Sequence, residues 1–314
     1  MTLIPFVTLD DPRYGQVVDL SPLVRRVVAE NPSKFTYHGT GTYIVGRGDV
    51  AVIDPGPALD GHRDALAAAL DGERVTSVLI THCHADHSPL AGWLSQTTGA
   101  PTVGFGPHPR LDDPDADDPI TSDADSGQSV AVEESTDYDF VPDIAVATGD
   151  LAARGDGWSL TAVHTPGHTS NHVCFGLDAE RALFTGDHVM GWSTTVIAPP
   201  DGDMRAYLDS LRRVAGRDDA VLLPTHGAPV TDPHPYLEVF LAHRLDREAQ
   251  VLSAVRNGLS SIADMVAVLY ADVRVELHKP AARSVLAHLV KLVDDGVVAV
   301  DDGEPRLRAA FRPV

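Results

Sequence analysis

The chain has 314 residues, of which 43% are hydrophobic and 22% are charged, and its formal net charge is -21 at pH 7. These proportions exclude a mainly disordered chain, and the length favours a principal domain with a smaller companion. No apolar run reaches the roughly 20 residues that a transmembrane helix needs, so we expect no membrane association.

The cysteines and the first residues indicate the cellular compartment. Residues 1–6 lack the basic region and the long apolar segment of a signal peptide. Cys83 and Cys174 are the only cysteines, which is too few for a disulfide framework. We therefore expect a cytoplasmic location. The negative charge also disfavours nucleic acid as a partner, unless a bound cation reverses the local field.

The first predicted elements are two strands, a helix and a third strand. Residues 42–45 and 50–53 form a strand pair joined by a glycine-containing connection. A helix over residues 61–70 follows, because apolar side chains recur there at helical spacing. A strand at 75–80 then leads directly into the run Thr81-His82-Cys83-His84-Ala85-Asp86-His87.

The next segment, residues 111–140, has a different composition. It is rich in aspartate, contains no Lys or Arg and shows little periodicity. We interpret it as a mobile acidic surface loop inserted into the principal domain. A solvated insertion is favoured over a lid or a calcium site.

Three later strands each lead to a side chain of metal-ligand type. Residues 160–163 lead through His164-Thr165-Pro166-Gly167 to His168, residues 182–186 lead to Asp187, and residues 221–225 lead to His226. If these strands lie side by side, their ends bring the three side chains to one edge. Strand ends are where scaffolds usually carry their chemistry.

The C-terminal part is predicted to be mainly helical. Helices are expected over about 204–214 and 236–255. The tail predicts a helix capped by Ser260 or Ser261, a helix from Pro280 to Gly296, and a hairpin of residues 297–300 and 306–311. Helices followed by a hairpin indicate a winged helix. We therefore predict a principal domain over 1–245 and a C-terminal domain over 246–314.

The run from His82 to His87 places four ligand-type side chains within six residues. A strand that continues into a loop and a helix start could turn them toward a pair of ions. Imidazole and carboxylate donors suit zinc, manganese or iron, and without a thiolate-rich set the site is not a closed structural zinc site. Together with His168, Asp187 and His226, the run predicts a metal centre with open coordination positions.

Several polar residues lie beside these predicted ligands. For His164, His172 and His188 a structural role is favoured over contact with a ligand or substrate. Cys83 should point away from the ions if its neighbours point toward them. Asp54, at the end of its strand, either orients a ligand or only forms a turn.

These motifs resemble those of the metallo-β-lactamase superfamily. The matching segments, in the family order, are His82-Cys83-His84-Ala85-Asp86-His87, Thr165-Pro166-Gly167-His168-Thr169, Thr185-Gly186-Asp187 and Pro224-Thr225-His226-Gly227. The resemblance implies an α/β fold, the αββα sandwich. It also implies that His82, His84 and His168 hold one metal, that Asp86, His87 and His226 hold the other, and that Asp187 bridges them. Thr225 stands where the family usually has glycine.

A closer resemblance is to the β-lactamase-like protein 2 branch, which adds a C-terminal winged helix. It rests on the tail and on three segments, Gly39 to Tyr43, Gly186 to Val196 and His243 to Glu248. The acidic insertion is a departure from this pattern. Animal members of the branch resemble single-strand-selective endoribonucleases, whereas other relatives act on thioesters, lactones or β-lactams. A homodimer is an expectation from the resemblance alone.

The charge of the tail favours one of these substrates. Residues Arg247 to Val314 include nine basic and nine acidic side chains, whereas a nucleic-acid-binding winged helix normally has a basic excess. We therefore predict a hydrolase that acts on a small acyl substrate, such as a thioester or a lactone. A single-strand-selective endoribonuclease is the first alternative and a β-lactamase the second. A non-hydrolytic metal protein would need a flavoprotein domain or an iron-selective ligand set, which the sequence does not show.

The expected cofactors are two divalent metal ions, with zinc favoured over manganese and iron. In the expected mechanism a hydroxide that bridges the two metals attacks the substrate, while one metal polarises the scissile group. Asp86 is the predicted catalytic residue, because a carboxylate beside the nucleophile can orient or deprotonate it while also binding a metal.

Overall fold

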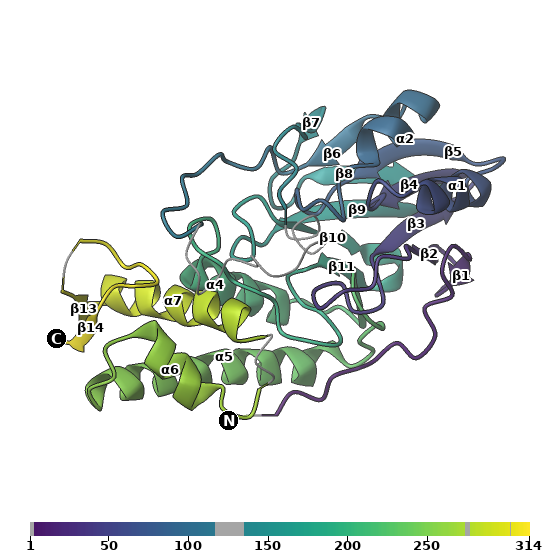
Figure 1. The fold of residues 1–314 in the computed structure, drawn as a ribbon. Helices are drawn as coiled ribbons and strands as arrows, with labels where there is room; N and C mark the ends of the chain where they lie inside the picture. Colours follow the sequence, from purple (N-terminus) through teal and green to yellow (C-terminus); the bar gives the residue numbers. More distant parts are fainter. Residues whose placement is uncertain (1–2, 117–134, 274–276, 302) are drawn as a thin grey trace.

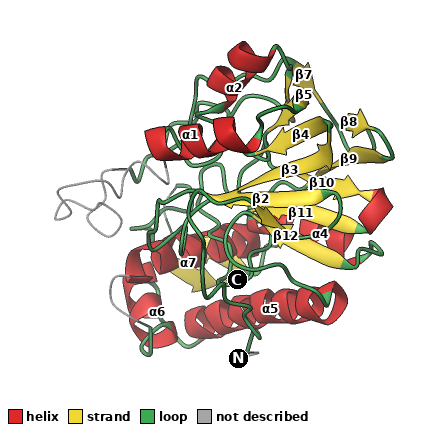
Figure 2. Ribbon diagram, turned by 90° about the vertical axis from the view of Figure 1, so that its right-hand side faces the viewer, coloured by secondary structure: helices red, strands yellow, loops and turns green. Residues whose placement is uncertain are grey.

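The computed structural model (Figure 1) describes residues 3–116, 135–273, 277–301 and 303–314. Two β-sheets face each other, and helices cover the outer face of each sheet. Turned by 90° (Figure 2), the molecule shows α1 and α2 above the strands and α5 below them, and α4 packs with α5 against the second sheet. This arrangement is the αββα sandwich that the sequence predicted.

The first sheet has seven strands in the order β1-β2-β3-β4-β5-β6-β7. The pairs from β1 to β4 are antiparallel, and those from β4 to β7 are parallel. The strands span Val18–Asp19, Val24–Val28, Gly41–Arg47, Asp49–Ile53, Arg74–Leu79, Thr102–Gly104 and Ile144–Ala145.

The second sheet has five strands in the order β12-β11-β10-β9-β8, and only its β11–β12 pair is parallel. Its strands, in chain order from β8, span Leu151–Gly155, Trp158–His164, Val173–Leu177, Ala182–Gly186 and Val221–Pro224. The helices of the sandwich are α1, α2, the 3-10 turn η1, α4 and α5, which span Asp60–Ala69, Ala91–Thr98, Asp178–Glu180, Met204–Ala215 and Pro233–Arg256.

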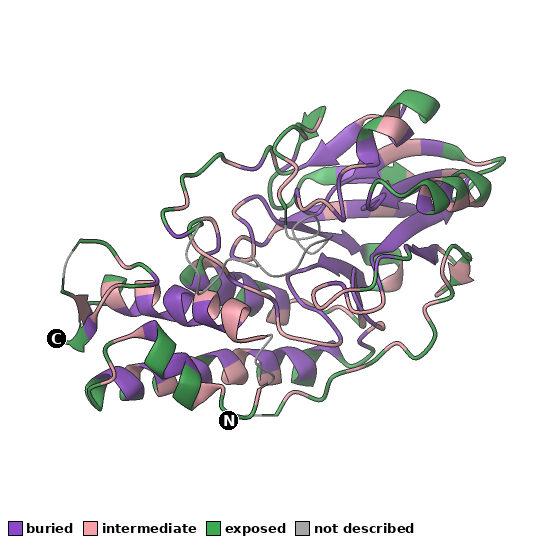
Figure 3. Ribbon diagram, in the orientation of Figure 1, coloured by how far each residue is buried: buried purple, intermediate pink, exposed green. Residues whose placement is uncertain are grey.

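Three hydrophobic layers hold the sandwich together. Tyr43 and Ile53 of the first sheet pack against Phe175 and Phe184 of the second. A second layer joins the first sheet to α1 and α2, and a third joins the other sheet to α4 and α5. Figure 3 shows the central strands buried along most of their length, whereas α1 and α2 expose their outer faces. Burial of these apolar faces is the main force that brings the sheets together.

The C-terminal unit has its own hydrophobic cluster. Its elements are α6 (Ile262–Leu269), α7 (His278–Asp294) and an antiparallel pair of β13 (Val298–Val300) and β14 (Phe311–Pro313). Helix α5 is shared, since Tyr236 and Phe240 pack on the sandwich while Val251 and Val255 pack in the C-terminal cluster. The predicted domain boundary at 245/246 falls inside this helix and stays a prediction.

Most predicted elements are present, and one was misplaced. The second strand of the C-terminal hairpin was predicted at 306–311 but begins at Phe311. Residues before it form a turn instead, in which the amide of Ala309 donates to the carbonyl of Arg306 and Leu307 is buried. The buried Leu307 therefore belongs to this turn, and a short stretch with one buried apolar residue does not distinguish a turn from a short strand.

The acidic segment 111–140 is described only at its ends, so the predicted mobile loop lies largely outside the described residues. At the first end, Asp113 forms an ion pair with Arg283 of α7, with 2.8 Å between Oδ2 and Nη2. At the other end, the amide of Ala85 donates to the carbonyl of Ser135. Within the described ranges, no helix is both long and apolar enough to cross a bilayer.

The β3–β4 hairpin offers a test of packing between the sheets. Gly46 has a φ of 98°, and a Cβ there would lie 2.4 Å from Nε1 of the buried Trp158. Gly48 also has a positive φ, of 73°, but a Cβ there would meet nothing within 4 Å. We expect G48A to lower the free energy of unfolding by about 1–2 kcal/mol for backbone strain. G46A should lower it by roughly 1–3 kcal/mol more through overpacking.

Urea denaturation of both variants measures this difference. Equal losses in G46A and G48A would contradict the packing described here.

Candidate metal centre

Seven ligand-type side chains from four strand ends meet at one edge of the sandwich. Strand β5 leads into the segment from His82 to His87, β9 leads toward His168, and β11 and β12 end just before Asp187 and His226. Their ligand atoms form three overlapping groups within 4.8 Å, namely His82, His84 and His168; His82, His87 and Asp187; and Asp86, His87 and His226. All seven predicted metal ligands therefore lie in one cluster.

The first group consists of three histidines that lie close together. Nδ1 of His84 lies 3.0 Å from Nε2 of His82 and 3.2 Å from Nε2 of His168. Burial, together with the neighbouring His168, lowers the pKa of His84 to about 3. Burial likewise lowers the pKa of His82 and of His168. These imidazoles are therefore neutral at pH 7, the form that binds a metal ion.

The second group mixes histidines and carboxylates. Oδ2 of Asp86 lies 3.3 Å from Nε2 of both His87 and His226. Burial alone would lower the pKa of His226, but Asp187 and Asp86 outweigh it and raise that pKa to about 10. Against the same effect of burial, Asp86, Asp54 and Asp187 raise the pKa of His87 well above its usual value. Both imidazoles hold protons that a bound metal would displace.

Asp187 lies between the two groups. Its Oδ1 lies 3.6 Å from Nε2 of His87 and 3.4 Å from Nε2 of His226, whereas its Oδ2 lies 3.9 Å from Nε2 of His168. Among the described residues, Oδ1 of Asp187 and Nε2 of His87 are buried without a hydrogen-bond partner. Buried polar atoms without partners are costly, so these residues fit a bound metal.

Two carbonyls, one hydroxyl and one carboxylate orient four of the histidine rings. Nδ1 of His168 donates to the carbonyl of Val196 at 2.7 Å, and Nδ1 of His226 donates to the carbonyl of Gly39 at 3.2 Å. Nδ1 of His87 donates to Asp54, and Nδ1 of His82 lies 3.1 Å from the Thr81 hydroxyl. Each contact leaves Nε2 of that ring directed into the cluster, which is how metal-binding histidines are usually held.

Asp54 holds the ring of the candidate ligand His87, which agrees with the first of the two roles predicted for it. Its carboxylate accepts hydrogen bonds from the amide and the hydroxyl of Thr81, at 2.8 and 2.7 Å, and from His87 at 2.9 Å. The hydroxyl of Thr225 donates to the same carboxylate at 3.3 Å. Thr225, in the position where the family usually has glycine, therefore adds a contact to this network.

Asn31 and Thr40 support Asp86 and escaped the sequence analysis. The Thr40 hydroxyl donates to Oδ2 of Asp86 at 2.8 Å, and the Asn31 side-chain amide donates to that hydroxyl at 3.0 Å. Thr40 lies in the segment Gly39 to Tyr43, but no spacing connects it to Asp86, which follows 46 residues later. Only the fold brings them together.

The neighbouring polar residues have structural contacts. His172 accepts a hydrogen bond from the backbone amide of Asp187 at 3.2 Å, His188 packs against the Tyr207 ring, and His164 stacks on Phe105. Cys83 belongs to none of the ligand groups, since its sulfur accepts a hydrogen bond from Asn171 at 2.9 Å. Burial raises the pKa of the Cys83 thiol to about 11.

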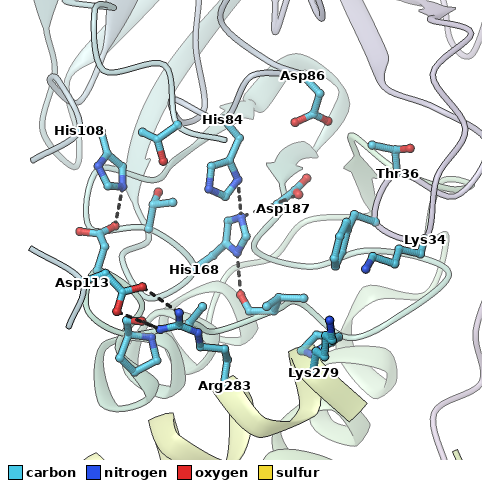
Figure 4. Close-up of a pocket in the computed structure, with 18 of the residues that line it drawn as sticks. Lys34, Thr36, His84, Asp86, His108, Asp113, His168, Asp187, Lys279 and Arg283 are labelled. Carbon is cyan, nitrogen blue, oxygen red and sulfur yellow. Dashed lines mark hydrogen bonds and ion pairs between the residues drawn. The ribbon is translucent and has the colours of Figure 1, made fainter. Parts of the chain in front are cut away.

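Five residues of the cluster, His84, Asp86, His168, Asp187 and His226, line a cleft of about 370 Å³ (Figure 4). One wall comes from α7, where Arg283 donates to Asp113 and to the carbonyl of Pro199. Another contains His108 and Asp201, whose Nε2 and Oδ2 lie 3.0 Å apart. Lys34 and Lys279 also line the cleft. The C-terminal unit therefore completes a cavity that the sandwich begins.

Two curated relatives share 31% identity with the chain, the atrochrysone carboxyl ACP thioesterases of Aspergillus novofumigatus and Paecilomyces divaricatus. The alignments cover 91% and 92% of this chain and 83% and 85% of the relatives. A lactamase-like protein of Aspergillus niger is 29% identical over 96% of this chain and 89% of its own length.

Solved structures share the fold at 20% identity. A beta-lactamase domain protein from Burkholderia ambifaria has a TM-score of 0.77 over 98% of this chain and 97% of its own. A metallo-beta-lactamase family protein from Thermus thermophilus has a TM-score of 0.69 over 94% of this chain and 100% of its own.

Two parts of the sequence match known families. Residues 261–306 match the beta-lactamase associated winged helix domain, in agreement with the predicted tail. Residues 37–226, more than half of the chain, match the metallo-beta-lactamase superfamily and include all seven candidate ligands. The chain therefore belongs to the metallo-beta-lactamase superfamily, and its C-terminal unit is the winged helix associated with that family.

Proposed function

We propose that this hydrolase cleaves acyl thioesters, and that it does so at a centre of two divalent metal ions. The observation that carries the proposal is the cleft, which is of small-molecule size and is lined by residues of the ligand cluster. The thioesterase names of two relatives support the same class of substrate.

The walls of the cleft suit an acyl group. Its lining includes the apolar and aromatic side chains Phe35, Leu111, Tyr138, Met190, Trp192 and Val196. Such walls bind the hydrocarbon part of an ester or thioester by excluding water from it. A phosphodiester chain would gain little from them. The net charge of -21 also opposes the approach of a long polyanion.

The two groups of ligands can hold one ion each. We assign His82, His84 and His168 to one ion and Asp86, His87 and His226 to the other, with Asp187 shared. Asp187 supports this arrangement because its two oxygens face different groups. Bound ions of this kind lower the pKa of water and stabilise negative charge on a carbonyl oxygen. The imidazole and carboxylate donors favour zinc, although manganese and iron accept the same donors.

Asp86 is the residue to which we assign the orientation of the attacking water. It lines the cleft, and Thr40 holds its Oδ2, so its carboxylate has a fixed position from which to accept a proton. Water adds to the thioester carbonyl carbon, the carbon–sulfur bond breaks, and the thiolate leaves and takes up a proton. The products are a carboxylic acid and a thiol.

The cellular setting stays a prediction. Cys83 and Cys174 are both free and buried, which supports the proposed cytoplasmic location. A homodimer remains an expectation from the resemblance.

A substrate comparison tests the proposed reaction. The purified, metal-analysed protein should hydrolyse acyl-coenzyme A thioesters with a higher kcat/KM than lactones, nitrocefin or single-stranded RNA. Thiol release measured with a chromogenic disulfide reports the thioester reaction. RNA cleavage that disappears in the D187A variant would instead establish the nuclease alternative.

Asp187 tests the shared ligand. We expect D187A to lose bound metal and to lower turnover by at least about a thousandfold, because metal ions supply several kcal/mol of charge stabilisation. Metal content by atomic emission and turnover are measured on the same sample. D201A is the matched control, since Asp201 lines the cleft outside the ligand groups and should keep its metal. Full metal content and activity in D187A would exclude the assignment.

The pKa shifts predict different pH dependences for the two ions. The pKa of His226 is about 10 and that of His87 is raised, so an ion bound beside them must displace protons at neutral pH. Its apparent affinity should rise about tenfold per pH unit for each displaced proton. The ion beside His84, whose pKa is about 3, should bind almost independently of pH between 6 and 8. Zinc titration against a competing chelator at these pH values measures both steps, and equal slopes would contradict the prediction.

A further inference from the structure

Arg244 lies in the middle of α5 and is buried, with 3% of its surface exposed. It belongs to the segment His243 to Glu248, to which neither the ligand cluster nor the cleft gives a role. A buried guanidinium is costly unless its N–H groups have partners. Within the described part of the chain, Arg244 forms no ion pair. Its Nη2 instead donates to the carbonyl oxygen of Thr195, and its guanidinium lies 5.1 Å from the centre of the Tyr207 ring.

The segment that Arg244 holds contacts two metal-ligand residues. The Thr195 hydroxyl donates to the backbone carbonyl of Asp187 at 2.5 Å and lies 3.0 Å from that of His188. The next carbonyl, that of Val196, accepts the Nδ1 hydrogen of His168 at 2.7 Å. The Thr195–Val196 peptide thus lies between Asp187 and His168.

Tyr207 reinforces the same arrangement. Its hydroxyl donates to the carbonyl of His188 at 3.0 Å, while its ring lies against the guanidinium of Arg244. Arg244 therefore contacts both the Thr195 carbonyl and the ring of Tyr207, and the hydroxyl of Tyr207 binds the carbonyl of His188, the residue after Asp187. Removing the guanidinium would free the Thr195 carbonyl and leave a buried gap beside Tyr207.

We propose that Arg244 is a positioning residue of the metal centre, which holds Asp187 and His168 in ligand geometry through Thr195 and Val196. The inference rests on the metal centre of the proposed function. Groups that orient metal ligands typically contribute about 10–100-fold to metal affinity. Because Asp187 and His168 belong to different ligand groups, displacement of this one peptide weakens the binding of both ions.

The location of Arg244 also connects the C-terminal unit to the metal centre. Helix α5 continues beyond Arg244 into the C-terminal hydrophobic cluster, where Val251 and Val255 pack. The position of Arg244 therefore depends on how that cluster packs.

Zinc affinity of the full chain tests the proposal. R244M keeps the length and apolar volume of the side chain but removes its donors, and it should lower zinc affinity about 10–100-fold in chelator competition. R244K, which can still donate to one carbonyl, should recover part of that loss. The visible spectrum of the cobalt-substituted protein should change in R244M, because Asp187 and His168 shift.

Arg247 provides the matched control. It is buried on the same helix, with 4% exposed, and its guanidinium lies 4.1 Å from the Tyr270 ring, but it donates to the carbonyl of Leu269 in the C-terminal unit. R247M should therefore lower the melting temperature while leaving zinc affinity and the cobalt spectrum unchanged. Equal losses of zinc affinity in R244M and R247M, or an unchanged affinity in R244M, would overturn the proposal.

A variant of Thr195 tests the positioning role if R244M does not fold. T195V keeps the shape of the side chain and the backbone carbonyl that Arg244 binds, but loses the hydroxyl that holds Asp187. Its zinc affinity should fall as well, and an unchanged affinity would contradict the proposed connection. Metal ions are the only ligands in these experiments, so their outcome is independent of whether thioesters are the substrates.

Discussion

The site depends most on the hydrogen bonds that the Asp54 carboxylate accepts. Asp54 directly follows β4, and its carboxylate accepts hydrogen bonds from Thr81 and His87 after β5 and from Thr225 after β12. Strands β4 and β5 belong to one sheet and β12 to the other. A single buried carboxylate therefore connects the two sheets at the edge where the ligands lie. Buried polar groups that are fully hydrogen-bonded in this way fix one arrangement of the backbone.

Around this point the ligand cluster divides into two electrostatic halves. The three histidines of the first group have lowered pKa values because they are buried beside one another. On the other side of Asp187, the pKa values of His87 and His226 are raised because these two rings face carboxylates. The raised pKa values of His87 and His226 mean that protons on these rings balance the charge of Asp86 and Asp187, and bound cations would take over that role.

That the seven candidate ligands lie together could be predicted from the sequence, because each directly follows, or lies a few residues beyond, a strand of recognisable pattern. Strand ends are local features, and the spacing of His82, His84, Asp86 and His87 is visible in one short run. Thr40 and Arg244 could not be predicted in this way, since their partners lie 46 and 49 residues away in the chain, and Asn31 acts on Asp86 only through Thr40. The misplaced strand at 306–311 has the same origin. Leu307 is buried in the C-terminal hydrophobic cluster, and its amide donates to the side chain of Asp115, which is 192 residues away in the chain.

The wall that α7 contributes to the cleft is separate from the strand ends that carry the candidate ligands. The strand ends carry the candidate ligands, so substitutions there change the ligand cluster itself. Arg283, Lys279 and Pro280 of α7 line the same cavity but belong to none of the ligand groups. Substitutions on α7 can therefore change the shape and charge of the cleft while the ligand cluster stays intact.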